Sequence, residues 1–184
     1  MRSTIEMNKY IYFDNAASTK PYKEVIEKIS YANEYMYANP SALHRMGLNV
    51  ENEIKQSRNT VAHILNVPDK NIIFTSGGTE SNNLAITGYL KSNHRRGNHI
   101  ITSEIEHPSV LNTILYAKQY GYTISYLKHD KFGCIDVDYF KELLTKDTAL
   151  ISIMHVNNET GLINNIKELL TLKNKIDKKI CFHV

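Results

Sequence analysis

The sequence of 184 residues is long enough for one ordinary domain, and 42% of its residues are hydrophobic while 22% are charged. This composition excludes a disordered tail, a collagen-like fibre and a coiled coil. The formal net charge of +3 is too small to indicate nucleic-acid binding, for which a concentrated basic face is expected. No apolar run approaches the roughly 20 residues that a membrane span requires.

The cysteine content and the N-terminal residues indicate a cellular compartment. The two cysteines, Cys134 and Cys181, are too few for a disulfide framework and do not form a CxxC motif, which suits a reducing cytoplasm. Residues 1–9 are polar and contain no apolar signal core. We therefore expect a cytoplasmic protein that binds neither a membrane nor nucleic acid.

The predicted elements begin with a short strand over Tyr10–Asp14, followed by an amphipathic helix from Pro21 to Met36 and a second helix over Leu48–Leu65. After residue 66, strands and helices alternate regularly. The predicted strands cover Ile72–Thr75, His99–Ser103, Tyr122–Leu127, Ala149–Met154 and Lys179–Val184. The predicted helices cover Thr79–Leu90, Pro108–Tyr120, Asp136–Lys146 and Asn164–Lys175.

Strands separated by such helices indicate right-handed crossovers and a parallel sheet. We therefore predict an α/β fold with three layers, in which a mainly parallel sheet is flanked by helices. The sequence stops inside an apolar strand, and such strands are normally covered on both faces. We expect the chain to be a piece of a longer protein.

The first candidate site is the SGGTES segment at residues 76–81, which follows a predicted strand and opens a helix. Glycines allow a ligand to approach the backbone closely, and a helix N-terminus offers free N–H groups to an anion. The hydroxyls of Ser76, Thr79 and Ser81 add donors, so the segment suits a phosphate. The structural alternative is a glycine turn in which Thr79 only caps the helix. The spacing matches neither GxGxxG nor GxxxxGK[ST], which argues against Rossmann and P-loop sites.

The second candidate is His107, in the EIEHP segment at residues 104–108, again between a strand and a helix. A histidine at a strand end can stack on a planar ligand or move protons near neutral pH. The alternative is a surface histidine that precedes a helix-starting proline. A metal hydrolase that uses Glu104, Glu106 and His107 is disfavoured because alternate residues of an extended chain point in opposite directions. We predict no metal site.

The third candidate is the HVNNETG segment at residues 155–161, which follows another predicted strand. An amide side chain there can bond a ligand hydroxyl or phenolate. The alternative is an Asx turn in which Asn157 or Asn158 organises the loop. Because ligands bind beyond the carboxyl ends of parallel strands, the three segments together predict a site for a flat, phosphorylated cofactor.

These segments resemble those of the cysteine desulfurases, which belong to the class V aminotransferase group of pyridoxal-phosphate enzymes with the type I fold. The resemblance covers nearly the whole chain, from about Tyr10 to Val184. It is carried by YFDNAAST at 12–19, NPS at 39–41, SGGTES at 76–81, the pair Glu106-His107 and SIMHVNNETG at 152–161.

The resemblance implies a role for several residues. Gly78 and Thr79 would hold the phosphate of pyridoxal 5'-phosphate. His107 would stack on the cofactor ring and, as the catalytic residue, help to move substrate protons. Asn158 would bond the phenolic oxygen of the ring. Asn15 and Ala16 lie in the segment that helps to shape the substrate pocket.

The resemblance also implies an organisation and a reaction. Residues 1–20 would shape the substrate pocket, 21–65 would form an N-terminal helical region, and 66–184 would be an incomplete cofactor-binding domain. The substrate would be L-cysteine, converted to L-alanine with sulfur left on the enzyme for iron–sulfur clusters or thio-cofactors. The full-length family implies a homodimer and leaves the sulfur-acceptor protein unidentified. A selenocysteine lyase and a true aminotransferase are the alternatives within class V.

Three residues that the family requires have no match in this chain. They are the lysine that forms a Schiff base with the cofactor, the aspartate that pairs with the pyridine nitrogen, and the cysteine that accepts sulfur. Neither Cys134 nor Cys181 matches that cysteine. The strand at 181–184 resembles the one that leads into the aspartate. We therefore expect the chain alone to be inactive; the alternative is a non-catalytic fragment that pairs with its missing half.

Overall fold

The computed structural model describes residues 11–130 and 132–184. The chain divides into two compact units, one ending at Phe74 and the other spanning Thr75–Val184. Within the described residues, no helix combines the length and the apolar character that crossing a membrane demands.

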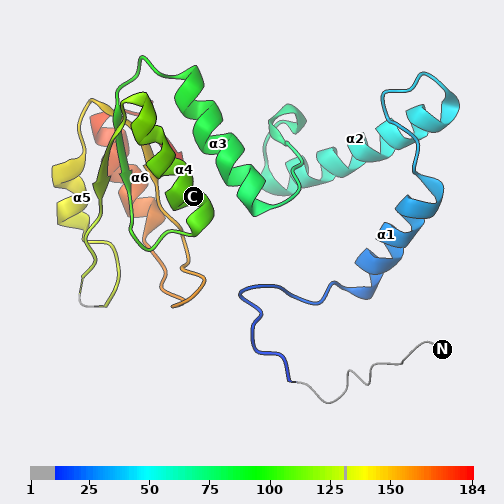
Figure 1. Cartoon of the computed structure of the whole chain (residues 1–184), viewed down its shortest axis with the longest axis horizontal. Helices are drawn as coiled ribbons and strands as arrows, with labels where there is room; N and C mark the ends of the chain where they lie inside the picture. Colours follow the sequence, from blue (N-terminus) through cyan, green and yellow to red (C-terminus); the bar gives the residue numbers. More distant parts are fainter. Residues whose placement is uncertain (1–10, 131) are drawn as a thin grey trace. The chain divides into compact units, whose positions relative to one another are not determined.

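The first unit contains helix α1 (Lys23–Tyr35), helix α2 (Arg45–Leu65) and the 3-10 helix η2 (Asp69–Asn71) (Figure 1). Both predicted helices are confirmed, although α2 begins three residues earlier than Leu48. It starts there because His44 caps it, accepting a hydrogen bond from the backbone N–H of Gly47 at 3.2 Å.

Two predicted strands are wrong. Residues 11–14 and 72–75 have no strand structure, and Tyr10 lies outside the described residues. A strand requires a hydrogen-bonded neighbour, and no described strand pairs with either segment. Ile73 and Phe74, which the prediction placed in a strand, are 68% and 50% exposed.

The second unit is built on one parallel sheet of four strands in the order β2-β1-β3-β4. The strands are β1 (His99–Thr102), β2 (Thr123–Tyr126), β3 (Thr148–Ser152) and β4 (Cys181–His183). The helices are α3 (Gly78–Ser92), α4 (Pro108–Ala117), α5 (Val137–Leu143) and α6 (Ile166–Ile176), with the 3-10 helix η3 at Lys118–Tyr120. The predicted α/β fold with its parallel sheet is confirmed.

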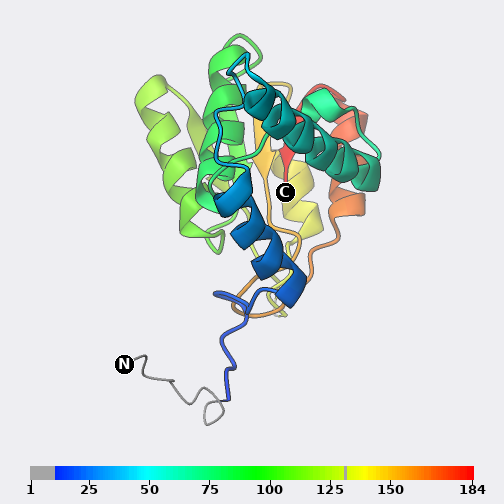
Figure 2. The same ribbon diagram turned by 90° about the vertical axis from the view of Figure 1, so that its right-hand side faces the viewer.

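Helices cover both faces of this sheet (Figure 2). On one face, Ile86 of α3 and Ile114 of α4 pack against Ile100 of β1. On the other face, Phe140 of α5 and Leu169 of α6 belong to a second apolar cluster. All five residues of β3 are buried because this strand has a neighbouring strand on each side and helices over both faces.

The direction of winding reverses between β1 and β3. From β1 the chain crosses through α4 to β2 on one side, whereas from β3 it crosses through α6 to β4 on the other side. Such a switch point is where ligands bind in open α/β sheets, beyond the carboxyl ends of the strands. The loops that leave β1 and β3 at this edge are those that contain His107 and Asn158.

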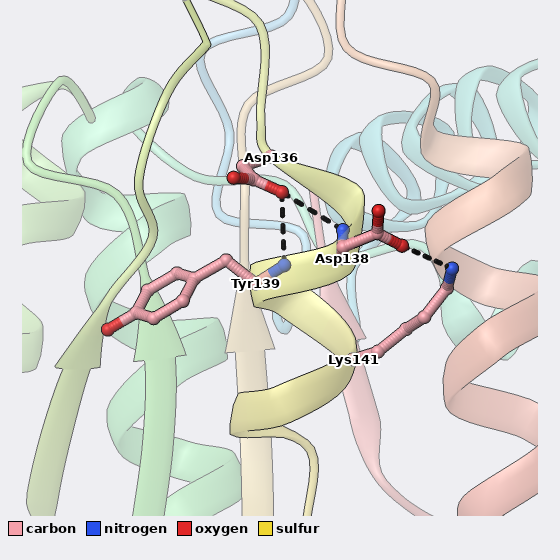
Figure 3. Close-up of polar contacts among 4 residues, drawn as sticks. All are labelled: Asp136, Asp138, Tyr139 and Lys141. Atoms are coloured by element: carbon pink, nitrogen blue, oxygen red, sulfur yellow. Dashed lines mark hydrogen bonds and ion pairs between the residues drawn. The ribbon is translucent and has the colours of Figure 1, made fainter.

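Helix α5 has only seven residues, and a side-chain cap defines its start (Figure 3). One carboxylate oxygen of Asp136 accepts hydrogen bonds from the backbone N–H groups of Asp138 and Tyr139, each at 3.0 Å. On the exposed side of the helix, Lys141 pairs with Asp138 at 2.7 Å. The cap satisfies two N–H groups that a helix of this length would otherwise leave open.

Candidate functional site

The first turn of α3 is an open helix N-terminus. Gly77 is the N-cap and has no side chain to bond the free N–H groups, and Gly78 is the first helical residue. A Cβ atom at either glycine would meet no other atom within 4 Å. The predicted strand before this loop is absent, yet the glycine pair opens a helix of 15 residues as expected. Its N–H groups and dipole favour an anion.

Among the hydroxyls predicted at this turn, Thr79 differs from the others. Ser76 is held by Glu80, whose carboxylate accepts from both its hydroxyl and its backbone N–H at 2.6 Å. These two bonds lower the pKa of Glu80. Ser81 bonds Thr75 at 2.6 Å. The Thr79 hydroxyl is exposed and has no partner within the described part of the chain. Thr79 lies inside the helix and does not cap it.

Helices α3 and α4 are joined by two polar contacts near their N-termini. The Asn82 amide donates to the Ser109 hydroxyl at 2.8 Å. The Thr113 hydroxyl donates to Asn83 at 2.9 Å, and Asn83 in turn donates to the Thr79 carbonyl at 2.9 Å. These contacts fix the first turn of α3 relative to the start of α4.

His107 is the N-cap of α4. Its Nδ1 atom accepts a hydrogen bond from the backbone N–H of Ser109 at 3.1 Å, and the Ser109 hydroxyl lies 2.7 Å from the same nitrogen. The ring is exposed. His107 is therefore a surface histidine that caps the helix, and it is also an accessible imidazole at the carboxyl edge of the sheet.

Thr79 and His107 line one pocket of about 470 Å³. Its other lining residues come from α3 and α4: Asn83, Thr87, Pro108, Ser109, Asn112, Thr113 and Tyr116. The structure thus brings the hydroxyl of the glycine-rich turn and the candidate imidazole to one opening. Asn158 does not line this pocket.

A second groove of about 410 Å³ lies farther along the same two helices, around Leu90, Tyr120 and Tyr122. Its lining combines apolar and aromatic side chains with polar ones such as Lys91 and His94, and it includes Gly97 and Asn98, which precede β1. It therefore lies toward the amino ends of the strands and contains none of the predicted site residues.

The loop after β1 and the loop after β3 are joined at two points. The Glu106 carboxylate accepts from the backbone N–H of Met154 at 2.7 Å. The Asn157 amide donates to the Ile105 carbonyl at 3.1 Å. These bonds hold the segment containing Asn158 beside the segment containing His107.

Asn157, rather than Asn158, organises the third segment. Its side-chain oxygen accepts from the backbone N–H groups of Glu159 and Thr160 at 3.0 and 2.9 Å, and also from the Thr160 hydroxyl. Asn157 is buried, whereas Asn158 is exposed. The Asx turn that sequence analysis left open is therefore formed by Asn157, and the neighbouring amide of Asn158 is accessible to a ligand.

Glu106 is a buried carboxyl group, and burial raises its pKa to about 7 even though the Met154 N–H favours the charged form. The sequence indicated Glu106 as part of the Glu106-His107 motif and as a disfavoured metal ligand, and gave no sign that it is buried. Across residues 11–130 and 132–184, no group of three or more His, Cys, Asp or Glu side chains could hold a metal ion.

Three polar residues of the second unit were not predicted from the sequence. Asn82 and Ser109 contact each other beside His107, and only their nearness to the SGGTES and EHP motifs could have indicated them. The third is His183 at the end of β4, whose Nδ1 lies 2.9 Å from the Ser152 hydroxyl. Burial lowers the pKa of His183.

Asn15 and Ala16 belong to the first unit. They lie in an exposed turn in which the backbone N–H of Ala17 bonds the carbonyl of Asp14 at 3.2 Å. The substrate role of these residues stays a prediction.

The model of one protein family, described as aminotransferase class V, matches residues 11–184. The chain belongs to the class V aminotransferase family. The expectation drawn from the sequence motifs is thus confirmed at the level of the family.

Relatives of this class V chain include several proteins named cysteine desulfurase. The chain is 42% identical over 177 residues to a cysteine desulfurase IscS of Dictyoglomus turgidum, and the match covers 96% of this chain and 44% of that protein. It is 41% identical to cysteine desulfurase IscS 1 of Archaeoglobus fulgidus, over 89% of this chain and 43% of that protein. The chain spans less than half the length of these curated relatives.

Solved structures of similar proteins share the fold of this class V chain. A NifS-like protein superposes with a TM-score of 0.90 at 33% identity, over 95% of this chain and 48% of that chain. A structure described as SspA in complex with cysteine gives a TM-score of 0.86 at 38% identity, over 95% of this chain and 50% of that chain. The resemblance to cysteine desulfurases therefore holds in both sequence and structure.

Proposed function

We propose that this chain supplies cofactor-binding residues to a pyridoxal-phosphate-dependent cysteine desulfurase, which converts L-cysteine to L-alanine and leaves sulfur on a protein thiol. One observation carries the proposal: Thr79, in an open helix N-terminus, and the exposed imidazole of His107 line the same pocket. The relatives named cysteine desulfurase and the related structure described with cysteine support the choice of substrate.

The donor set fits the proposed cofactor. The glycine pair leaves room at the helix N-terminus, and the free N–H groups with the Thr79 hydroxyl suit a phosphate dianion. His107 offers a flat ring for stacking, and Asn158 offers an exposed amide on the neighbouring loop. When bound, pyridoxal phosphate supplies an electron sink for bond cleavage at the amino acid.

The chain's own residues then have distinct tasks. Thr79 and the α3 N-terminus bind and orient the phosphate, and the Asn83 contacts keep that turn in place against α4. His107 would stack on the cofactor ring and move a proton of the bound amino acid. Asn158 would donate to the phenolic oxygen of the cofactor. Asn157 and Glu106 hold the two loops together.

The reaction requires groups that sequence analysis did not match in this chain. We propose that the 184 residues bind the cofactor weakly and do not turn over cysteine alone. A homodimer, a cytoplasmic location and a separate sulfur-acceptor protein are parts of the same proposal, by resemblance to the family.

Cofactor binding by the purified chain tests the proposal. Titration with pyridoxal 5'-phosphate, followed by absorbance, should give saturable binding that Thr79→Ala weakens about tenfold, on the scale of a lost charge-assisted hydrogen bond. Thr171→Ala, an exposed helical threonine of α6, is the control and should bind as the parent chain does. Equal affinity of the Thr79→Ala variant would contradict the phosphate assignment.

The reaction class needs a second experiment. The chain is mixed with the C-terminal remainder of the Dictyoglomus turgidum relative, and cysteine is supplied with the cofactor. Alanine formed by the mixture and by neither part alone would support both the desulfurase and its dependence on a second segment. Amino transfer to a keto acid without sulfur release would favour an aminotransferase. Alanine formed by the 184-residue chain alone would contradict its proposed inactivity.

A further inference from the structure

The hydrogen bonds around His107 define the protonation of its ring. A backbone N–H can only donate, and the N–H of Ser109 bonds Nδ1 at 3.1 Å. Nδ1 therefore carries no proton in this arrangement. In a neutral imidazole with an acceptor at Nδ1, the proton is on Nε2.

The Ser109 hydroxyl extends this arrangement. Its oxygen lies 2.7 Å from His107 Nδ1, and because that nitrogen is an acceptor, the hydroxyl must donate to it. The same oxygen accepts a hydrogen bond from the Asn82 amide at 2.8 Å. The Thr113 hydroxyl donates to the backbone carbonyl of Ser109 at 2.8 Å and does not engage the Ser109 hydroxyl.

We propose that Asn82 and Ser109 are positioning residues that hold the His107 imidazole in one orientation, with Nδ1 unprotonated and the proton on Nε2. In this hydrogen-bond relay, the Asn82 amide donates to the Ser109 hydroxyl, and that hydroxyl donates to His107 Nδ1. Ser109 is only 9% exposed, so water competes weakly for these bonds. The use of this tautomer toward a cofactor ring rests on the proposed function, whereas the tautomer itself does not.

The relay has a consequence for the proposed chemistry. Because Nδ1 accepts two hydrogen bonds from Ser109 of α4, Nε2 is the ring nitrogen that can carry and exchange a proton. The ring need not rotate or change tautomer when a ligand enters the pocket, because its orientation is already set. Asn82 connects this arrangement to α3, the helix that contains Thr79.

Nitrogen NMR of the full chain labelled with ¹⁵N-histidine tests the proposal, because the two neutral tautomers give different ring-nitrogen shifts. The His107 signals are assigned by their loss in His107→Asn. The parent chain should show unprotonated Nδ1 and protonated Nε2. Ser109→Ala removes the hydroxyl donor and should raise the minor tautomer about fivefold, on the scale of one net hydrogen bond.

Two further variants separate positioning from a general effect on folding. Asn82→Asp keeps the side-chain shape but turns a donor into an acceptor, so the Ser109 hydroxyl should turn toward the carboxylate and the minor tautomer should again rise about fivefold. Ser109→Thr keeps the hydroxyl and should restore the parent spectrum. A protonated Nδ1 in the parent chain would overturn the proposal, as would unchanged tautomer ratios in both Ser109→Ala and Asn82→Asp.

The NMR experiment is done without cofactor, so its outcome is independent of the proposed function. If the parent chain shows the expected tautomer but fails to bind pyridoxal 5'-phosphate, the relay stands and the proposed function fails. If the chain binds the cofactor but Nδ1 is protonated, the proposed function stands and the relay is wrong.

Discussion

The carboxylate of Glu106 accepts a hydrogen bond from the backbone N–H of Met154 across 2.7 Å, although the two residues are 48 positions apart in the chain. The bond joins the loops that leave β1 and β3, where the winding of the sheet reverses. An acidic side chain that is buried to make this contact must have its ionisation linked to folding. The burial of Glu106 therefore makes stability depend on pH, and the hydrogen bond from Met154 opposes part of that effect.

Glu106→Gln should remove a pH dependence of stability. Burial raises the folded-state pKa of Glu106 to about 7 from its ordinary value of 4.5, so the folded state retains a proton that the unfolded state loses. The contribution of protonated Glu106 to the free energy of unfolding is fully present below pH 4.5. It is lost as the pH rises toward 7, by up to about 3 kcal/mol. Glutamine is neutral and its oxygen can still accept from Met154.

Urea denaturation between pH 4 and 8 measures this effect. Glu106→Gln should flatten the decline between pH 5 and 7, whereas Glu104→Gln, at an exposed site nearby, should keep the slope of the parent chain. Parallel stability curves for Glu106→Gln and the parent chain would show that Glu106 does not titrate in this range.

Adjacent asparagines should respond differently to truncation. Asn157→Ala removes a buried side chain that bonds both loops, and should lower the free energy of unfolding by about 2 to 3 kcal/mol. Asn158→Ala alters an exposed residue and should change it by less than about 0.5 kcal/mol. Chemical denaturation measures both values. Under the proposed function, Asn158→Ala should nevertheless weaken pyridoxal-phosphate binding. An affinity equal to that of the parent chain would refute the assigned role of Asn158.

The cap of α5 gives a local test (Figure 3). Asp136→Ala leaves the N–H groups of Asp138 and Tyr139 without their acceptor and should destabilise the chain by about 1 kcal/mol. Asp138→Ala removes only the exposed pair with Lys141 and should cost clearly less stability than Asp136→Ala. Thermal and urea unfolding compare the two variants, and equal losses would mean that the cap contributes no more than the surface pair.

Two glycines should respond to alanine with opposite signs. At Gly97, φ is +140°, and an added Cβ would lie 2.1 Å from the Asp147 carbonyl oxygen, so Gly97→Ala should destabilise by about 2 kcal/mol or more. Gly88 lies inside α3 with no atom within 4 Å of an added Cβ. Gly88→Ala should therefore stabilise by about 0.5 to 1 kcal/mol, because glycine weakens a helix interior. Unfolding curves that shift in the same direction would contradict this difference.

Local sequence patterns predicted most of the fold because they reflect local physics. The helix at Gly78–Ser92 follows from its glycine start and apolar spacing, and the strand at Thr148–Ser152 from its continuous apolar run. The segment Ile72–Thr75 has an equally good strand pattern, but a strand also needs a partner, and the pattern contains no information about one.

The candidate site was predictable in its motifs and not in its connections. Asn157 and Asn158 have identical side chains, so the sequence does not show which one bonds the carbonyl of Ile105. The fold shows that Asn157 does, although the two residues are 52 positions apart. The contact between Asn82 and Ser109 likewise joins two helices that sequence spacing treats as separate. Bonds between distant segments depend on the packing of the sheet, which local patterns do not specify.

The strand order has a consequence for how the chain folds during synthesis. His99 of β1 contacts Ser125 of β2, 26 positions later, and Thr148 of β3, 49 positions later. The β1–β2 pair can therefore form before β3 has left the ribosome, and closing the longer loop costs more entropy. Until β3 arrives, β1 presents an unpaired apolar edge, which is a template for aggregation. The centre of the finished sheet is thus the most vulnerable part of the nascent chain, and the loops that meet there are joined only once β3 is in place.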